Sequence, residues 1–198
     1  MMDSTRLTPM VDAIAADDDE CAEARVLQLT SAEEPALGEL LQRGNADQRW
    51  WAARALAHCG TEQTLPILLA TLADEDATLR VVAVLALAAI HDRLPAVVAP
   101  HLPQIAARLA DEDGTVRQAA VDALIQCGDA AIEALLTVLR FSDHEGARSR
   151  AAAALRKIST PATVPALFRC LNDPNYLVHT YAYEALDEMG LLETQLVI

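Results

Sequence analysis

The segment from Pro103 to Gly128, PQIAARLADEDGTVRQAAVDALIQCG, decides the fold of this chain. It reads as one helix, an acidic turn and a second helix. Its skeleton starts at the proline and continues 2, 6, 14, 17, 20 and 21 residues later with Ile105, Leu109, Arg117, Ala120, Ala123 and Leu124. The last three positions share one stripe of a helix, where the alanines let a neighbouring helix approach closely and the leucine fills the space between layers.

The same skeleton occurs four more times along the chain. Each copy is marked by its arginine, or by the histidine that replaces it: Arg49, Arg80, Arg117, Arg148 and His179. The spacings between these markers are 31, 37, 31 and 31 residues. A fixed period in this range is typical of repeat proteins. The sequence therefore predicts an all-α fold, a right-handed α-solenoid (superhelix) of stacked antiparallel helix pairs with no strand in its core.

We expect one repeat domain over residues 1–198. Residues 31–190 would hold the five helix pairs, and residues 191–198 a C-terminal tail. The skeleton does not fit residues 1–30, where two helices are expected around an aspartate-rich turn. Terminal repeats are often atypical because one of their faces meets water, so this segment is interpreted as an N-terminal cap.

Three local patterns predict where helices begin. Ser31-Ala-Glu-Glu34 reads as a capping box, with a helix starting near residue 32. Asp173-Pro174 reads as an N-cap followed by proline at the first helical position. Between the second and third copies, six extra residues (37 − 31) fall in a stretch with three prolines. Proline interrupts helices, so an additional turn or short helix is expected there.

Two segments, RWWAARALAHCG at 49–60 and VRQAAVDAL at 116–124, resemble HEAT-like repeats. More narrowly, they are similar to the short repeats of about 31 residues first described in phycobilin lyases. The resemblance covers roughly residues 32–190. It implies an interaction scaffold that binds a protein or peptide on its concave face. The alternative that it leaves open is a subunit of a phycobilin-lyase-like or other protein-modifying complex.

Charge and hydropathy exclude some partners. The net charge is −14, with 29 acidic and 15 basic side chains, and such a surface repels phosphate backbones. We therefore expect no nucleic acid partner. The longest apolar run, Val81 to Ile90, is about half the length of a membrane-spanning helix, so no membrane association is expected. No signal peptide is evident, and the four cysteines form no CxxC site, which favours a cytoplasmic protein with cysteines as small core residues.

Enzymes of the deoxyhypusine hydroxylase type resemble this fold but place His-Glu pairs directly after the arginine position, where they bind iron. The corresponding pairs in this chain are Trp50-Trp51, Val81-Val82, Gln118-Ala119, Ser149-Arg150 and Thr180-Tyr181. The five histidines fall in different repeats or in the insertion, and their spacing does not bring three ligands together. We expect no metal, no cofactor, no catalytic residue and no enzymatic activity.

The positions one, two and five residues after each arginine point away from the alanine and leucine stripe. In a solenoid, second helices usually line the concave binding surface. The residues selected from these positions are Trp50, Trp51, Arg54, Val81, Val82, Leu85, Gln118, Asp122, Arg150 and Tyr181. The first two copies are apolar and the others are polar, which predicts an apolar centre with a polar margin. Two alternatives stay open: the N-terminal cap or a second copy of the chain covers the apolar part.

The repeated charges are interpreted as structural. Each repeat arginine is expected to reach an aspartate in the turn of its own or the next pair. Arg156 and Lys157 in the fourth copy align with Asp187 and Glu188 in the fifth. Equivalent positions on stacked helices are neighbours, so these charges are expected to pair across the two repeats.

Overall fold

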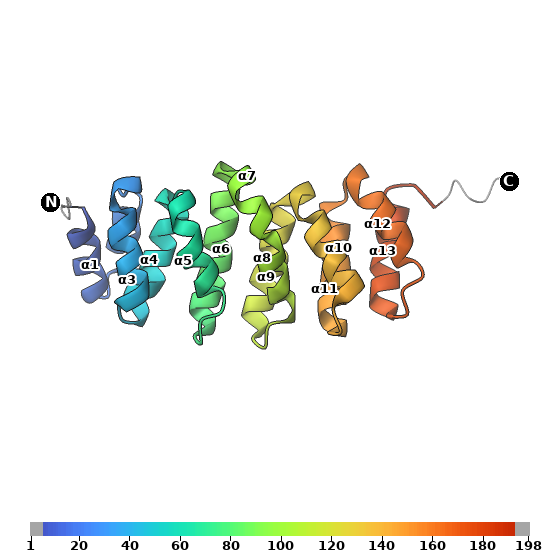
Figure 1. Cartoon of the computed structure of the whole chain (residues 1–198), viewed down its shortest axis with the longest axis horizontal. Coiled ribbons are helices and arrows are strands. Elements are labelled where there is room, and N and C mark those ends of the chain that lie inside the picture. Colours follow the sequence, from blue (N-terminus) through green and yellow to red (C-terminus); the bar gives the residue numbers. More distant parts are fainter. Residues whose placement is uncertain (1–5, 193–198) are drawn as a thin grey trace. The chain divides into compact units, whose positions relative to one another are not determined.

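The computed structural model describes residues 6–192, which consist of helices and the turns between them and include no strand (Figure 1). The chain divides into two compact units, residues 1–98 and 99–198. Residues 193–198, most of the predicted tail, lie outside the described part. The predicted class, an all-α solenoid of stacked helix pairs, is confirmed within each unit.

The first unit holds seven α-helices. Their bounds are α1 Leu7–Ala15, α2 Asp19–Val26, α3 Glu34–Arg43, α4 Ala46–Cys59, α5 Leu65–Thr71, α6 Ala77–Arg93 and α7 Pro95–Val98. Short 3-10 turns, Ser31–Glu33 and Glu62–Thr64, lead into α3 and α5. The pair α1 and α2 is the predicted cap, and both helices contact α4.

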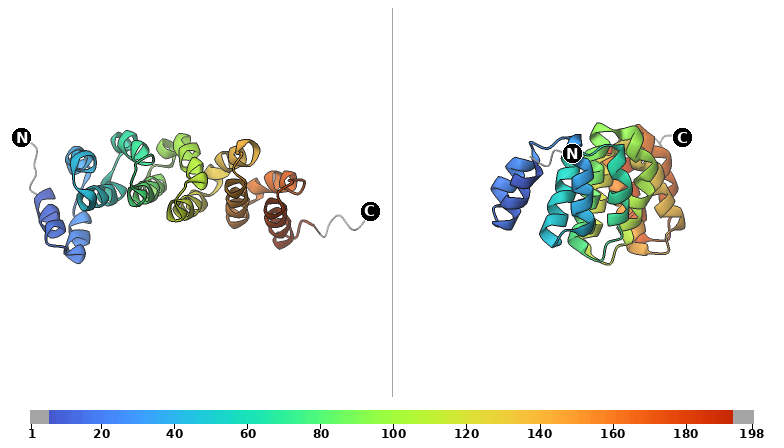
Figure 2. Two further views of the ribbon diagram at one scale, coloured as in Figure 1. Left: turned by 90° about the horizontal axis from the view of Figure 1, so that it is seen from below. Right: turned by 60° about the vertical axis from the view of Figure 1, so that its left-hand side comes forward.

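The second unit starts with the 3-10 turn Ala99–His101 and holds six α-helices. Their bounds are α8 Leu102–Ala107, α9 Gly114–Gln126, α10 Ile132–Phe141, α11 Glu145–Ile158, α12 Val164–Cys170 and α13 Tyr176–Glu188. Within each unit, the first helices of the pairs form one layer and the second helices form the other (Figure 2). The second-layer helices are α4 and α6 in the first unit and α9, α11 and α13 in the second.

The repeat skeleton forms the core of the pairs. Ala120 and Leu124 are fully buried, and Ala123 is 1% exposed. Leu56 and Leu87 at the equivalent positions of earlier copies are also fully buried. Alanine along the second helices lets them pack closely, and leucine fills the space between the layers, as the periodicity predicts.

Side-chain caps fix where the second helices begin. Asn45 accepts a hydrogen bond from the amide of Gln48 at 2.9 Å, and Gln48 accepts one in return from the amide of Asn45. Asp76 accepts from Thr78 at 2.8 Å, and Asp113 does the same at its own helix. Such caps satisfy amides that have no partner inside the helix.

Two of the predicted helix starts are wrong by one or two residues. The capping box is formed by Thr30 and Glu33, with the Thr30 amide 2.8 Å from the Glu33 carboxylate, instead of by Ser31 and Glu34. The last helix is capped by Asn175, which accepts from the Leu177 amide at 3.0 Å, instead of by Asp173. In both places two neighbouring residues suit the cap, and the sequence alone does not choose between them.

The insertion forms the expected short helix, α7, followed by a 3-10 turn, and the boundary between the two units falls between them. Before it, α6 continues to Arg93. Arg93 donates to the backbone carbonyls of Ala57 and Gly60 at 3.0 and 3.1 Å. It thereby satisfies acceptors at the C-terminal end of α4 that the helix leaves without a partner.

The arginine markers act partly as predicted. Arg49 forms an ion pair with Asp74 in the turn of the next pair. Arg117 and Arg148, however, donate to backbone carbonyls of their own turns, at 2.8 Å from Asp111 and at 2.8 Å from Ser142. The side chain bends back over the preceding turn, where the carbonyls at the end of the first helix lack helical partners. The repeated arginine therefore binds the turn of its own helix pair at Arg117 and Arg148, and it joins two pairs at Arg49.

Candidate functional site

The tryptophan pair lies on the second turn of α4. Trp50 is half-buried, whereas Trp51 is 8% exposed. The two indoles meet edge to face, with ring centroids 5.1 Å apart and planes inclined by 85°. Because successive helical residues are about 100° apart, Trp51 turns toward the packed interior while Trp50 keeps part of its surface open.

A cavity of about 540 Å³ lies between the tryptophans and the turn that joins α1 to α2. We name it the tryptophan cavity, and its lining residues are Ile14, Asp17, Asp19, Glu20, Glu23, Asp47, Trp50 and Trp51. Arg54, one turn along α4, forms an ion pair with Glu23. Sequence analysis selected the tryptophans and Arg54 but missed the five carboxylates, although three aspartates in a row at 17–19 are a visible signal.

On α6, the three predicted apolar residues have different surroundings. Leu85 is 47% exposed, Val81 is half-buried, and Val82 is only 3% exposed. The helix contacts α4, α5 and α7, so its apolar positions are covered on several sides. Val82 therefore packs inside the unit and offers almost no surface to a partner.

In the second unit, the polar residues predicted for the binding margin are already engaged with one another or with the backbone. The amide of Gln118 donates to Asp122 at 3.0 Å on the same helix. Arg150 donates to the backbone carbonyl of Leu109 at 2.9 Å, and burial, helped by the charge of Arg117, lowers its pKa. Arg150 remains charged, because arginine ionises far above neutral pH. Tyr181 is half-buried on α13.

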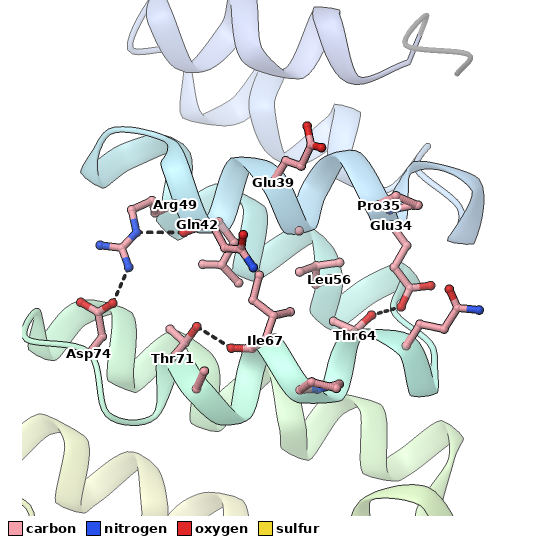
Figure 3. Close-up of a pocket in the computed structure, with 15 residues that line it drawn as sticks. Glu34, Pro35, Glu39, Gln42, Arg49, Leu56, Thr64, Ile67, Thr71 and Asp74 are labelled. Atoms are coloured by element: carbon pink, nitrogen blue, oxygen red, sulfur yellow. Dashed lines mark hydrogen bonds and ion pairs between the residues drawn. The ribbon is translucent and has the colours of Figure 1, made fainter. Parts of the chain in front are cut away.

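A second hollow, of about 670 Å³, lies between α3 and α5 (Figure 3), and we name it the outer groove. Its floor includes Leu56 from α4, and the Arg49–Asp74 ion pair closes one end. At the other end the Glu34 carboxylate, 7% exposed, accepts hydrogen bonds from Thr64. Sequence analysis missed this groove.

One signal for the outer groove was present in the sequence. Gly38, in the middle of α3, stands where the other copies carry Leu69, Ala106, Thr137 and Phe168. A Cβ atom at Gly38 would meet only the Ile67 side chain, at 3.9 Å. Glycine inside a helix costs about 1 kcal/mol relative to alanine, so its presence suggests a reason in packing. Here the missing side chain leaves the groove open.

Among residues 6–192, the thiols of Cys59 and Cys170 are poorly suited to act as nucleophiles, and no cluster of side chains is placed to hold a metal ion. Burial, with smaller contributions from Glu34 and Glu33, raises the pKa of Cys59 to about 11. Burial and the nearby Asp173 raise the pKa of Cys170 to about 11 as well. A thiol with such a pKa is protonated at neutral pH and is a poor nucleophile. Residues 6–192 contain no group of three or more His, Cys, Asp or Glu side chains placed to hold a metal ion.

The predicted pairing of charges between the last two second-layer helices is confirmed for Arg156 and Glu188. Arg156 of α11 forms ion pairs with Glu184 and Glu188 of α13. The partner Glu184 lies one turn before the residues expected from the alignment.

Among the described helices, none is long and apolar enough to cross a lipid bilayer.

Comparison with known proteins identifies the repeats. A sequence profile of HEAT repeats matches residues 34–107 and 102–187. No curated protein matches the chain. A designed armadillo repeat protein in complex with the peptide (KR)4 is 21% identical, over 90% of this chain and 97% of that chain, with a TM-score of 0.50. A second designed armadillo repeat protein is 22% identical, over 90% and 97% of the two chains, also with a TM-score of 0.50.

Proposed function

This chain belongs to the HEAT repeat family, and from that premise we propose that it is a non-catalytic module that binds a partner protein or peptide on the second helices of its first unit. Stacked helix pairs present extended side-chain surfaces, and repeat proteins of this architecture bind through them. The fold alone does not specify a function, so the proposal depends on the residues that this surface exposes.

The exposure of Leu85 is the observation that carries the proposal. Its side chain is 47% exposed on α6, and the equivalent position on α4 is Arg54, with Trp50 and Val81 half-buried one turn earlier on the two helices. These two helices contact each other along the stack. Apolar and aromatic side chains that remain in water on adjacent helices are typical of protein-binding surfaces, and tryptophan is a frequent anchor there.

The comparison with designed proteins supports peptide binding only at the level of the fold. The designed armadillo repeat protein of similar fold is in complex with the peptide (KR)4, which supports a peptide as one kind of partner. The residues that would bind in the present chain are inferred from its own surface. They are Trp50, Val81 and Leu85 as the apolar centre, with Arg54 beside them.

The test is a double substitution, Trp50→Ala with Leu85→Ser, followed by affinity capture from the native host and quantitative mass spectrometry. Leu85 is chosen instead of Val82 because a polar residue at a position that is 3% exposed would disturb folding. A suitable control is Leu27→Ser with Phe141→Ser, since these side chains are 59% and 76% exposed elsewhere in the chain.

We expect the Trp50→Ala, Leu85→Ser protein to lose partners that the wild type and the control both retain. Circular dichroism and the melting temperature should stay close to those of the wild type. Equal retention of every specific partner by both variants would contradict the proposed surface.

A further inference from the structure

The tryptophan cavity combines an aromatic wall with an uncompensated negative charge. Its eight lining residues include five carboxylates and two indoles, and none of them is basic. Arg54 forms an ion pair with one of the carboxylates, Glu23, at the margin. The cavity thus already attracts one guanidinium group from the protein itself, and four of its acids, Asp17, Asp19, Glu20 and Asp47, lie beyond that ion pair.

Stabilisation of helix N-termini explains several of these acids individually, but it does not explain why they line the same cavity. Asp19 and Glu20 lie in the first turn of α2, and Asp47 lies in the first turn of α4, where negative charge stabilises the helix. That role does not require the acids to face one cavity, and it does not require an indole beside them. The presence of a half-buried Trp50 in the same wall is the feature that a capping role leaves unexplained.

We propose that the tryptophan cavity receives a lysine or arginine side chain from a basic segment of the partner protein. The inference rests on the proposed function, because it assigns a chemical class to the partner of the same surface. A cation placed over an indole face is attracted by the ring, and the attraction grows when water is excluded. The carboxylates around the ring add charge-assisted hydrogen bonds, which are stronger than those between neutral groups.

The geometry favours an extended cation over a metal ion. Within residues 6–192, no three carboxylate, imidazole or thiol groups are placed to hold a metal ion, so the acids of the cavity surround a volume instead of converging on a point. A volume of about 540 Å³ is large enough for a guanidinium or ammonium group with part of its aliphatic stem. The stem would lie against Ile14 and the indoles, which supply apolar contact.

Charge complementarity also favours a basic partner over a second copy of this chain. The chain has 29 acidic and 15 basic side chains, so two copies repel each other over most approaches. A basic segment is attracted over a longer range, and that attraction raises the rate of association. An apolar residue a few positions away in the same segment would reach Leu85, which is exposed on the neighbouring helix α6.

The chain provides a built-in probe of this site. Its two tryptophans both line the cavity, so the intrinsic tryptophan fluorescence reports on the cavity alone. We would titrate the full chain with an eight-residue peptide of alternating lysine and arginine, and with an uncharged peptide of glutamine and serine. Fluorescence measures occupancy of the cavity, and anisotropy of a labelled peptide measures total binding.

The decisive variant is Glu20→Gln with Asp47→Asn, which removes two charges from the cavity. Its matched control is Glu133→Gln with Asp143→Asn, which changes the net charge equally at exposed positions of the second unit. We expect the basic peptide to alter the fluorescence, the cavity variant to bind it about tenfold more weakly, and the control to stay within about twofold of the wild type. The uncharged peptide should leave the fluorescence unchanged.

Two results would overturn the inference. One is peptide binding by anisotropy with no change in fluorescence, which would place the peptide elsewhere. The other is an equal loss in both variants, which would indicate attraction by net charge alone. A third outcome is that the basic peptide neither binds by anisotropy nor changes the fluorescence, while the Trp50→Ala, Leu85→Ser protein still loses its natural partner. The proposed function would then stand, and the inference of a basic partner would be wrong. If the peptide occupies the cavity but natural partners survive that substitution, the proposed binding surface is wrong.

Discussion

The carboxylate of Glu34 accepts hydrogen bonds from Thr61, from its amide at 3.0 Å and from its hydroxyl at 2.8 Å, across 27 residues of sequence. A third donor is the hydroxyl of Thr64. Glu34 begins the first helix of one pair, and the two threonines lead into the first helix of the next pair. A carboxylate that is 7% exposed is thus satisfied by side chains of the following repeat.

Thr64→Val should destabilise the first unit, because it removes one donor and leaves the shape of the side chain nearly unchanged. The expected loss in the free energy of unfolding is about 1–3 kcal/mol, since a buried acceptor loses a partner. Urea unfolding followed by circular dichroism measures it. The neighbouring exposed residue provides the control, and Gln63→Ala should change the stability little. Equal stability of Thr64→Val and wild type would show that this hydrogen bond contributes nothing.

Two glycines should respond in opposite directions to the same substitution. Gly38→Ala should stabilise the protein by about 0.5–1 kcal/mol, because alanine loses less backbone entropy in a helix and its Cβ atom meets only open space beside Ile67. Gly44→Ala should destabilise it, because a Cβ atom there would lie 2.6 Å from the Leu40 carbonyl oxygen. Melting temperatures of the two variants, measured side by side, test the pair. A lower melting temperature for Gly38→Ala would mean that the outer groove is not open.

The cysteines should differ in their reactivity. The raised pKa of about 11 at Cys59 and at Cys170 leaves about one thiol in a thousand ionised at pH 8. Cys21 is half-buried, whereas the other three are buried. Titration of the native protein with a thiol reagent at pH 8 should therefore show one fast site, and Cys21→Ser should remove it. All four thiols should react after denaturation, and four fast sites in the native protein would contradict the described core.

The ion pairs of Arg156 predict a dependence on pH. The hydrogen bond from Arg156, followed by its charge and that of Lys157, lowers the pKa of Glu188. A carboxylate whose pKa is lower in the folded state stabilises the protein above its unfolded pKa, and this contribution disappears as the pH falls through the folded value. Arg156→Gln should thus lower the melting temperature slightly at pH 7 and by less at pH 3.

Arg169→Gln is the matched control, because this exposed arginine lies on the neighbouring helix α12. Its effect on the melting temperature should be small at both pH values. High salt should reduce the effect of Arg156→Gln at pH 7, since exposed charges are screened. A difference between Arg156→Gln and wild type that is as large at pH 3 as at pH 7 would show that the arginine acts through packing.

The periodic part of the sequence predicted most of the fold. Spacing alone located the second helices, and the alanines and leucines of the skeleton, such as Ala120 and Leu124, are buried as expected. Periodicity works here because each pair repeats the same contacts with its neighbours. Helix starts were less predictable, since Thr30 and Ser31 both suit a cap and the choice depends on the packing of the following turn.

The candidate site was predicted only in part. On a single helix, Val82 lies away from the alanine and leucine stripe, so the sequence predicts it on the surface. In the structure, helices cover α6 on several sides, and Val82 is 3% exposed. Trp51 is covered for a related reason, because α1, α2 and α3 all contact α4. Four of the five acids of the tryptophan cavity, those at positions 17–23, lie about 30 residues from the indoles in sequence. Only the fold of the cap brings Asp17 and Glu20 to the same place as Trp50.

Several side-chain interactions between neighbouring pairs span about one repeat of the sequence. Arg49 reaches Asp74 over 25 residues, Thr64 reaches Glu34 over 30, and Arg156 reaches Glu188 over 32. Because each of these interactions ends in the adjacent pair, a change in one pair directly affects only its contacts with the neighbouring pairs. A gene duplication or deletion in register would lengthen or shorten the protein without disturbing its remaining joints, so array length is a property that evolution can adjust separately from the binding surface.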